Sequence, residues 1–180
     1  MSKAVLISIR PKWCQKIASA EKTIEVRKTR PKLETPFKAY IYCTMPDAKD
    51  PHNILELHGA DGKIRKANGK IIGEFTCDRI DRVNICGFWD DNGEQLENRI
   101  KETCLTPTEV NDYLGTEVGY GWHISDLLIY DQPRELSEFQ RATDPCDFCH
   151  AEYTWECTDC KKLSGGIKRP PQSWCYVEEG

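Results

Sequence analysis

The spacing of apolar residues along the first twenty positions changes from the pattern of a strand to that of a helix. AVLISI (4–9) is a short apolar run rich in β-branched residues, which predicts a strand. Pro11 follows at a position where the first turn of a helix tolerates proline. A helix from there to about Ala20 would have a single apolar stripe, formed by Trp13, Cys14, Ile17 and Ala18.

KTIEVRK (22–28) alternates between apolar and polar residues and predicts a second strand, which Pro31 ends. Ile24 and Val26 should point to one side of this strand. The polar alternates, Thr23, Glu25 and Arg27, should point to the other.

The rest of the chain continues with short strands and few helices. TPTEVNDYLG (106–115) predicts a helix, with Thr106 as N-cap, Glu109 three residues later and Gly115 at its end. Residues 45–69 are expected to be a long excursion with a hairpin near Asp61-Gly62, and residues 88–98 a loop. Further strands are expected at 37–44, 70–85, 119–131 and 173–179, and a short helix at 134–139.

These elements favour an α+β fold, in which a mixed sheet curls into a small barrel flanked by short helices. The sequence has no internal repeat and no low-complexity tract. Its 180 residues fit one domain, 1–180, with a small insertion at 144–169 before the final strand.

The composition is that of a soluble globular protein, with 39% hydrophobic and 30% charged residues. No apolar run approaches the ~20 residues that a membrane helix needs. The N-terminal residues do not resemble a signal peptide, and we therefore expect a cytoplasmic location.

Charge is distributed unevenly, although the chain as a whole carries a formal net charge of −4. Residues 1–38 contain ten Lys or Arg and three Glu, which gives +7, and the remaining residues therefore carry −11. Such asymmetry favours an anionic partner for one face of the protein.

Ten cysteines are present, and four of them are clustered. Cys146 and Cys149 form one CxxC pair, and Cys157 and Cys160 form a second after a seven-residue spacer. Two such pairs can present four thiolates in a tetrahedron, which suits a structural Zn²⁺. Disulfides, free thiols or a redox or iron–sulfur site are the alternatives. The six scattered cysteines are expected to be small buried residues: Cys14, Cys43, Cys77, Cys86, Cys104 and Cys175.

AEKTIEVR (20–27) resembles the Gly-x-Lys-x-x-Glu-x-Arg motif of the ASCH domain family, a branch of the PUA-like superfold. The stretches SIRPKWC, IGEF, WHISDLLIYD and PPQSWCYVE also resemble ASCH-domain proteins of prophages. The resemblance covers roughly 1–135 and 170–180. It implies a PUA-like barrel with a cleft at the motif, in a protein of phage origin.

The resemblance implies binding of RNA or a nucleotide. Some small ASCH members are amidohydrolases of N-acylated cytidines, and ribonuclease activity has been attributed to others. The motif residues carried over are Lys22, Glu25 and Arg27. Two departures stand out. Ala20 replaces the motif glycine, a mild change if the turn does not need a positive φ, and the amidohydrolase branch has Thr where this chain has Glu25.

Chemistry at the motif would use one carboxylate between two cations. The expected ligand contacts are Arg10, Lys12, Lys22, Glu25, Arg27, Lys28 and either Trp122 or His123, of which only one can face the cleft. Lys16 and Arg30 could extend the basic rim, and Glu74 could be a second carboxylate near Glu25.

Three functions remain open from the sequence. The first is an RNA- or nucleotide-binding module that uses the basic cleft. The second is a hydrolase of a modified nucleobase or of RNA, with Lys22 and Glu25 as the acid–base pair. The third is a factor that binds a protein partner through the cysteine-rich segment.

Overall fold

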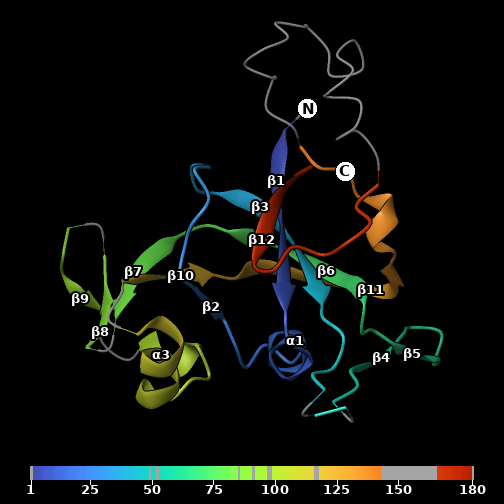
Figure 1. Cartoon of the computed structure of the whole chain (residues 1–180), viewed down its shortest axis with the longest axis horizontal. Coiled ribbons are helices and arrows are strands. Elements are labelled where there is room, and N and C mark those ends of the chain that lie inside the picture. The colour runs from blue at the N-terminus through green and yellow to red at the C-terminus, as the bar shows by residue number, and fades with distance from the viewer. Residues whose placement is uncertain are drawn as a thin grey trace, which may run out of the picture. The chain divides into compact units, whose positions relative to one another are not determined.

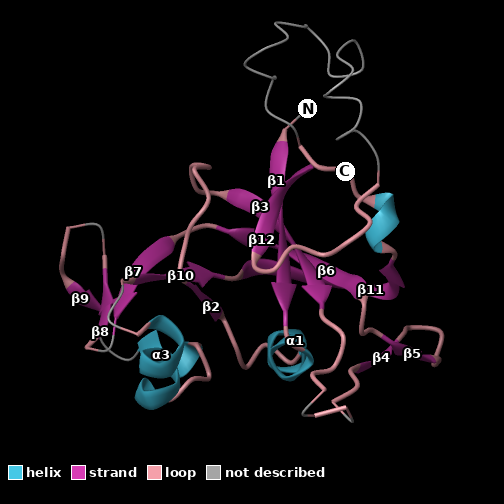
Figure 2. Ribbon diagram, in the orientation of Figure 1, coloured by secondary structure: helices cyan, strands magenta, loops and turns pink. Residues whose placement is uncertain are grey.

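The computed structural model describes residues 2–48, 50–51, 53–84, 86–90, 92–96, 99–115, 118–142 and 166–179. Strands dominate, and the helices are short (Figures 1 and 2). The elements in chain order are β1 Lys3–Ile9, α1 Pro11–Ala18, β2 Ile24–Arg27, β3 Phe37–Cys43, β4 Glu56–His58, β5 Ile64–Lys66, β6 Lys70–Cys77, β7 Ile80–Asn84, β8 Gly87–Trp89, β9 Gln95–Leu96, α2 Arg99–Glu102, α3 Pro107–Leu114, β10 Gly119–His123, β11 Ser125–Arg134, the 3-10 helix η1 Leu136–Glu138 and β12 Trp174–Glu178.

The chain forms two compact units, of which the first comprises Met1–Pro11, Lys38–Glu74 and Ile129–Gly180. Its sheet has the strand order β11-β6-β3-β1-β12. β1 runs parallel to β3 and antiparallel to β12, so the sheet is mixed, as the sequence predicts. Alternate residues of these strands build its core, in which Leu6, Tyr40 and Ile71 pack with Val177.

The second unit, Lys12–Phe37 and Phe75–Leu128, contains a second sheet with the order β2-β10-β7-β8-β9. Its core contains Ile24 and Val26 of β2, Val83 and Phe88 of the neighbouring strands, and Val110 and Leu114 of α3. The prediction that Ile24 and Val26 share an apolar side of their strand is therefore confirmed.

Two predicted strands prove to be two elements each. Residues 70–85 divide into β6 and β7, which belong to different sheets, and residues 119–131 divide into β10 and β11. Neither break carries a glycine or proline, so no residue typical of a turn marks either of them in the sequence.

Two further segments differ from the sequence prediction. The loop expected at 88–98 contains the β8–β9 hairpin, in which Phe88 pairs with Leu96. The short helix α2 had no predicted counterpart. The other predicted elements are present, including the β4–β5 hairpin around Asp61-Gly62 and the α3 capping box between Thr106 and Glu109.

Closure of the strands into a barrel remains a prediction, and so does the cysteine insertion at 144–169, most of which lies outside the described residues. Among the residues that are described, no helix is long and apolar enough to cross a membrane.

Candidate functional site

The turn between α1 and β2 places the AxKxxExR motif. The Ala20 amide donates to the Ile17 carbonyl and the Glu21 amide to the Lys16 carbonyl, at 2.9 Å each. This is the paired hydrogen-bond pattern of a Schellman C-cap, whose left-handed residue is normally glycine. Ala20 occupies that position with φ +58°. The turn therefore needs a positive φ at this position. The replacement of the motif glycine by Ala20 strains the backbone and is not a mild change.

Lys22, Glu25 and Arg27 come together as predicted and form a buried ion triad. Lys22 Nζ lies 3.2 Å from Glu25 Oε2, and Arg27 Nη2 lies 2.9 Å from Glu25 Oε1. The exposed fractions of the three side chains are only 1%, 8% and 9%. An exposed ion-pair ladder, which would contribute little stability, does not describe this arrangement.

The Lys22 ammonium group has its hydrogen-bonding capacity filled by the protein. Besides Glu25, it donates to the carbonyls of Ile24 at 2.8 Å and Thr103 at 2.7 Å. Its three N–H groups therefore have three acceptors. The Trp13 ring centroid lies 5.3 Å from the same nitrogen. Lys22 thus ties β2 to the buried Thr103 that follows α2.

Cross-strand register shows which side chains share a face with the triad. Antiparallel residues that pair directly point to the same side of a sheet. Arg27 of β2 pairs with Tyr120 of β10, Tyr120 pairs with Arg82 of β7, and Arg82 pairs with Trp89 of β8. In the next row, Glu25 pairs with Trp122 and Trp122 with Ile80. We call the side that carries these two rows the charged face.

The opposite face of this sheet is filled by the core beneath α3. A Cβ atom placed on Gly121 would lie 2.4 Å from the Phe88 ring, and one on Gly119 would lie 2.5 Å from the Leu114 side chain. Both distances are shorter than real contacts allow. Glycine at these two positions lets the core approach β10 closely, which leaves the charged face as the side for polar chemistry.

The charged face is closed around Glu25 and Trp122. The Trp122 side chain is fully buried, and the Phe37 ring packs edge-on against it at 5.8 Å between centroids. Trp122 therefore has no accessible surface on which an external base could stack.

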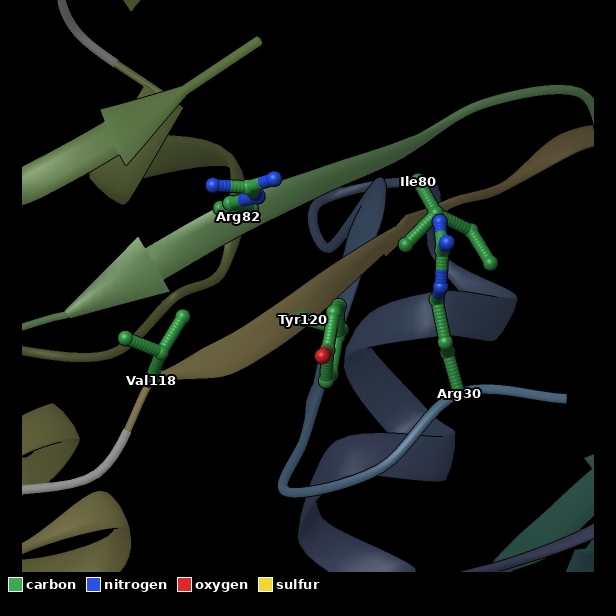
Figure 3. A pocket seen from close by; sticks show the side chains of 5 residues that line it. All are labelled: Arg30, Ile80, Arg82, Val118 and Tyr120. Atoms are coloured by element: carbon green, nitrogen blue, oxygen red, sulfur yellow. The ribbon is translucent and has the colours of Figure 1, made fainter. Parts of the chain in front are cut away.

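The same face is open where β2 ends. A recess of about 280 Å³ is lined by Arg30, Ile80, Arg82, Val118 and Tyr120. In the view of Figure 3, Tyr120 lies between Arg82 and Val118 on one side and Arg30 and Ile80 on the other. Arg30, Arg82 and Val118 are exposed, and Tyr120 is half-buried. We call this pocket the open recess.

Most cations of residues 12–30 have a carboxylate nearby. Lys12 lies 3.9 Å from Glu109, and Lys16 lies 2.9 Å from Glu21, which raises the pKa of the lysine and lowers that of the glutamate. Lys22 and Arg27 share Glu25.

Lys28 and Arg30 differ, since neither has a carboxylate partner within the described part of the chain. Each lies over an aromatic ring, with 5.7 Å from Lys28 Nζ to the Tyr113 centroid and 5.7 Å from Arg30 Cζ to the Tyr120 centroid. Of these two cations, Arg30 lines the open recess, and Lys28 lies against α3 at the same end of β2.

The remaining predicted contacts are spread over several elements. Arg10 is exposed and belongs to the first unit, and Lys12 is exposed on α1, with its ammonium 4.4 Å from the Trp13 centroid. His123 Nδ1 lies 2.6 Å from Asp78 Oδ1. His123 alternates with Trp122 along β10, as expected. Trp122 points to the same side of the sheet as Glu25, with which it pairs directly.

Glu74, considered as a second carboxylate, belongs to the first unit. There it accepts a hydrogen bond from Tyr130 at 2.5 Å and pairs with Lys38 at 3.2 Å. Desolvation and the contact with Glu74 raise the pKa of Tyr130.

No group of His, Cys, Asp and Glu that could hold a metal is found among the described residues. The predicted ligands Cys146, Cys149, Cys157 and Cys160 lie outside them, and the zinc site remains a prediction. Of the scattered cysteines, Cys14, Cys43 and Cys77 are buried as expected. The prediction is wrong for Cys86, which is exposed, and Cys104 and Cys175 are only half-buried. Burial raises the pKa of the Cys77 thiol to about 12.

Sequence reasoning missed most of the open recess. Arg82 and Tyr120 are more than fifty residues from Arg27 in the chain, and only the strand register brings them into one row. The basic rim did include Arg30, because it lies within the positively charged N-terminal segment.

Comparison with known proteins gives structural matches. No protein-family model matches the chain, and no curated protein sequence matches it significantly. The crystal structure of ASCH from Zymomonas mobilis matches with a TM-score of 0.58 at 18% identity, over 98% of this chain and 88% of the other. A tyrosine-to-phenylalanine mutant of that protein matches with a TM-score of 0.59 at 18% identity, over 99% and 92%. The chain therefore has the mainly-β ASCH fold with short helices, which confirms the fold that its motif indicates.

Proposed function

We propose that this chain binds RNA or a nucleotide through the charged face of its second sheet, at the solvent-exposed end beside the AxKxxExR motif. One observation carries the proposal. Arg30 and Arg82 have no carboxylate partner in the described part of the chain, and they line the open recess with Tyr120. Lys28, also without a carboxylate partner there, lies over Tyr113 of α3 at the same end of β2. Phosphates attract such cations, and aromatic rings and guanidinium planes stack on unpaired bases. The ASCH fold supports RNA binding in general terms.

The ion triad has a supporting role in this proposal. Its side chains are almost fully buried, and the lysine has no N–H group left for a ligand. We propose that it fixes the course of β2, so that Lys28 and Arg30 leave the strand beside Tyr113 and Tyr120. In this proposal the motif residues hold the backbone in position, and the residues that follow the motif contact the ligand.

Fluorescence anisotropy with a short labelled oligouridine tests the proposal. Affinity should fall steeply with salt, because each phosphate contact with a single strand contributes about −0.7 to the slope of log K against log[salt]. Lys28→Gln should weaken binding and lower the slope by about that amount. The matched control is Lys66→Gln, an exposed lysine of β5 in the first unit, which should bind as the unmodified protein does. Absence of binding at low salt, or equal loss in both variants, would contradict the proposal.

The second candidate is a hydrolase of N-acylated cytidines or of RNA, with Lys22 and Glu25 as the acid–base pair. Its support is the close approach of the two side chains and the slight exposure of Glu25. Chromatography after incubation with N-acetylcytidine and with labelled RNA tests it. Turnover by the unmodified protein that Glu25→Gln abolishes would favour this candidate. Without turnover, or with equal turnover in the variant, binding is the better account.

We also propose that Cys146, Cys149, Cys157 and Cys160 hold one structural Zn²⁺, on the spacing of the two CxxC pairs. Metal analysis of the purified protein should give one zinc per chain. Cys146→Ser with Cys149→Ser should lose it, whereas Cys86→Ser, which changes an exposed single cysteine, should retain it. Zinc-free protein with all four thiols reactive would contradict this proposal.

A further inference from the structure

We infer that the open recess is a subsite for one nucleotide, in which a nucleobase stacks on the Tyr120 ring and its phosphate pairs with Arg82 and Arg30. The inference rests on the proposed binding of RNA or a nucleotide. It specifies that one nucleotide is bound in the recess, and it names the residues that bind this nucleotide. None of these three residues belongs to the AxKxxExR motif.

The recess is built by separate parts of the second unit. Tyr120 comes from β10, Ile80 and Arg82 from β7, and Arg30 from the segment after β2. Direct pairing of Tyr120 with Arg82 places their side chains next to each other on the charged face. Two paired strands therefore hold an aromatic ring and a guanidinium group side by side before any ligand arrives.

The size and walls of the recess suit a single nucleotide. Its volume of about 280 Å³ lies just below the range of ligand pockets, which run from about 300 to 1,000 Å³. Ile80 and Val118 supply apolar walls beside the ring of Tyr120. A flat base can lie on that ring with its edges against these walls, while the ribose and phosphate extend toward solvent.

The charges of the recess specify an anionic ligand. Its lining includes two arginines and no carboxylate. Within the described residues, neither guanidinium has an ion-pair partner to give up on binding. Arg82 can therefore donate to a phosphate without giving up an ion pair within the described residues, and a planar guanidinium can bind two phosphate oxygens at once.

The exposed side chain of Arg30 can change its position when a ligand enters the recess. Its guanidinium carbon lies 5.7 Å from the centroid of the Tyr120 ring, and its side chain is exposed. Arginine is weakly hydrated and stacks readily on aromatic rings. When a base replaces Arg30 on the Tyr120 ring, Arg30 can shift to the phosphate of the same nucleotide. The ring then stacks on the base, and the guanidinium binds the phosphate.

Binding of labelled oligouridine to four variants, with competition by UMP and by uridine, tests the inference. Tyr120→Ala should bind about 5- to 150-fold more weakly, from the contribution of one stacked base. Tyr120→Phe keeps the ring and should stay close to the unmodified protein. Arg82→Gln should weaken binding and lower the salt slope by about 0.7, and Arg82→Lys should restore the slope. Thermal melts confirm that each variant is folded.

The competitors show whether the nucleotide is free or part of a chain. UMP that displaces the oligouridine at concentrations where uridine does not would show that the recess takes a free nucleotide through its phosphate. Loss of oligouridine affinity in Tyr120→Ala and Arg82→Gln, without competition by UMP, would assign the recess to a nucleotide within a strand. Both outcomes support the subsite.

Failure of this inference is distinct from failure of the proposed function. If the unmodified protein binds oligouridine and folded Tyr120→Ala and Arg82→Gln bind it equally well, the recess is not the subsite, although RNA binding stands. If the unmodified protein binds neither oligouridine nor UMP at low salt, both proposals are wrong.

Discussion

The charged face of the second sheet has two ends that share residue types and differ in exposure. At one end, Lys22, Glu25 and Arg27 are buried and joined by ion pairs, and the lysine also donates to two backbone carbonyls. At the other end, Arg30 and Arg82 surround the half-buried Tyr120 and have no carboxylate partner within the described chain.

The difference between the two ends lies in how charge is compensated. A buried charge must be paired and hydrogen-bonded, and such a group is costly to disturb. An exposed cation without a partner costs little and remains available to a ligand. A recognisable motif can therefore mark the part of a site that holds the backbone in place, while adjacent residues contact the ligand.

Loss of the triad lysine should give the largest effect on stability. Lys22→Met leaves the Glu25 carboxylate with fewer partners and two buried carbonyls without a donor. We expect the free energy of unfolding to fall by about 3 kcal/mol in urea denaturation followed by tryptophan fluorescence. Lys16→Met, which removes an exposed ion pair, should leave stability nearly unchanged.

A double variant sharpens this prediction. Lys22→Met alone keeps the buried pair of Glu25 with Arg27. Adding Glu25→Gln removes the carboxylate that this arginine pairs with, and the double variant should therefore be less stable than Lys22→Met alone. Equal stability of the single and the double variant would contradict the account of the triad as a compensated buried group.

Adding one carbon to the covered side of β10 should give the next largest effect. Gly121→Ala places a Cβ atom 2.4 Å from Phe88 and 3.0 Å from Ile24. Overpacking of this kind costs about 1–3 kcal/mol. Val118→Ala, at an exposed position of the open recess, should change stability much less. Equal thermal shifts in the two variants would show that the faces of this sheet are not divided as described.

The smallest predicted effect on stability concerns the turn that leads into the triad. Ala20 has φ +58°, which costs a residue with a Cβ atom about 1–2 kcal/mol and glycine nothing. Part of this gain is offset by the greater freedom of glycine in the unfolded chain. Ala20→Gly should therefore stabilise the protein by about 0.5–1 kcal/mol in the same denaturation measurement. A destabilised variant would show that Ala20 does not need the left-handed conformation.

Local sequence patterns predicted much of the second unit. Alternation in 22–28 correctly placed Ile24 and Val26 in the core and Glu25 and Arg27 on the other side. The Thr106–Glu109 box correctly marked the start of α3. Each of these signals lies within one element, where side-chain periodicity and capping chemistry determine the outcome.

Features that depend on pairing between distant strands could not be predicted in this way. The row of Arg27, Tyr120 and Arg82 exists only through the register of β2, β10 and β7. The breaks that separate β6 from β7 and β10 from β11 have no glycine or proline to mark them. The strained turn at Ala20 was also hidden, because alanine gives no signal of a positive φ.

The salt dependence of oligouridine binding by the unmodified protein and by Arg82→Gln tests the central claim most directly. The claim is that the open end of the charged face contacts phosphate while the buried triad only supports it. We predict that Arg82→Gln melts at the same temperature as the unmodified protein, binds more weakly, and has a salt slope lower by about 0.7. Identical affinities and slopes for the two proteins would contradict the claim.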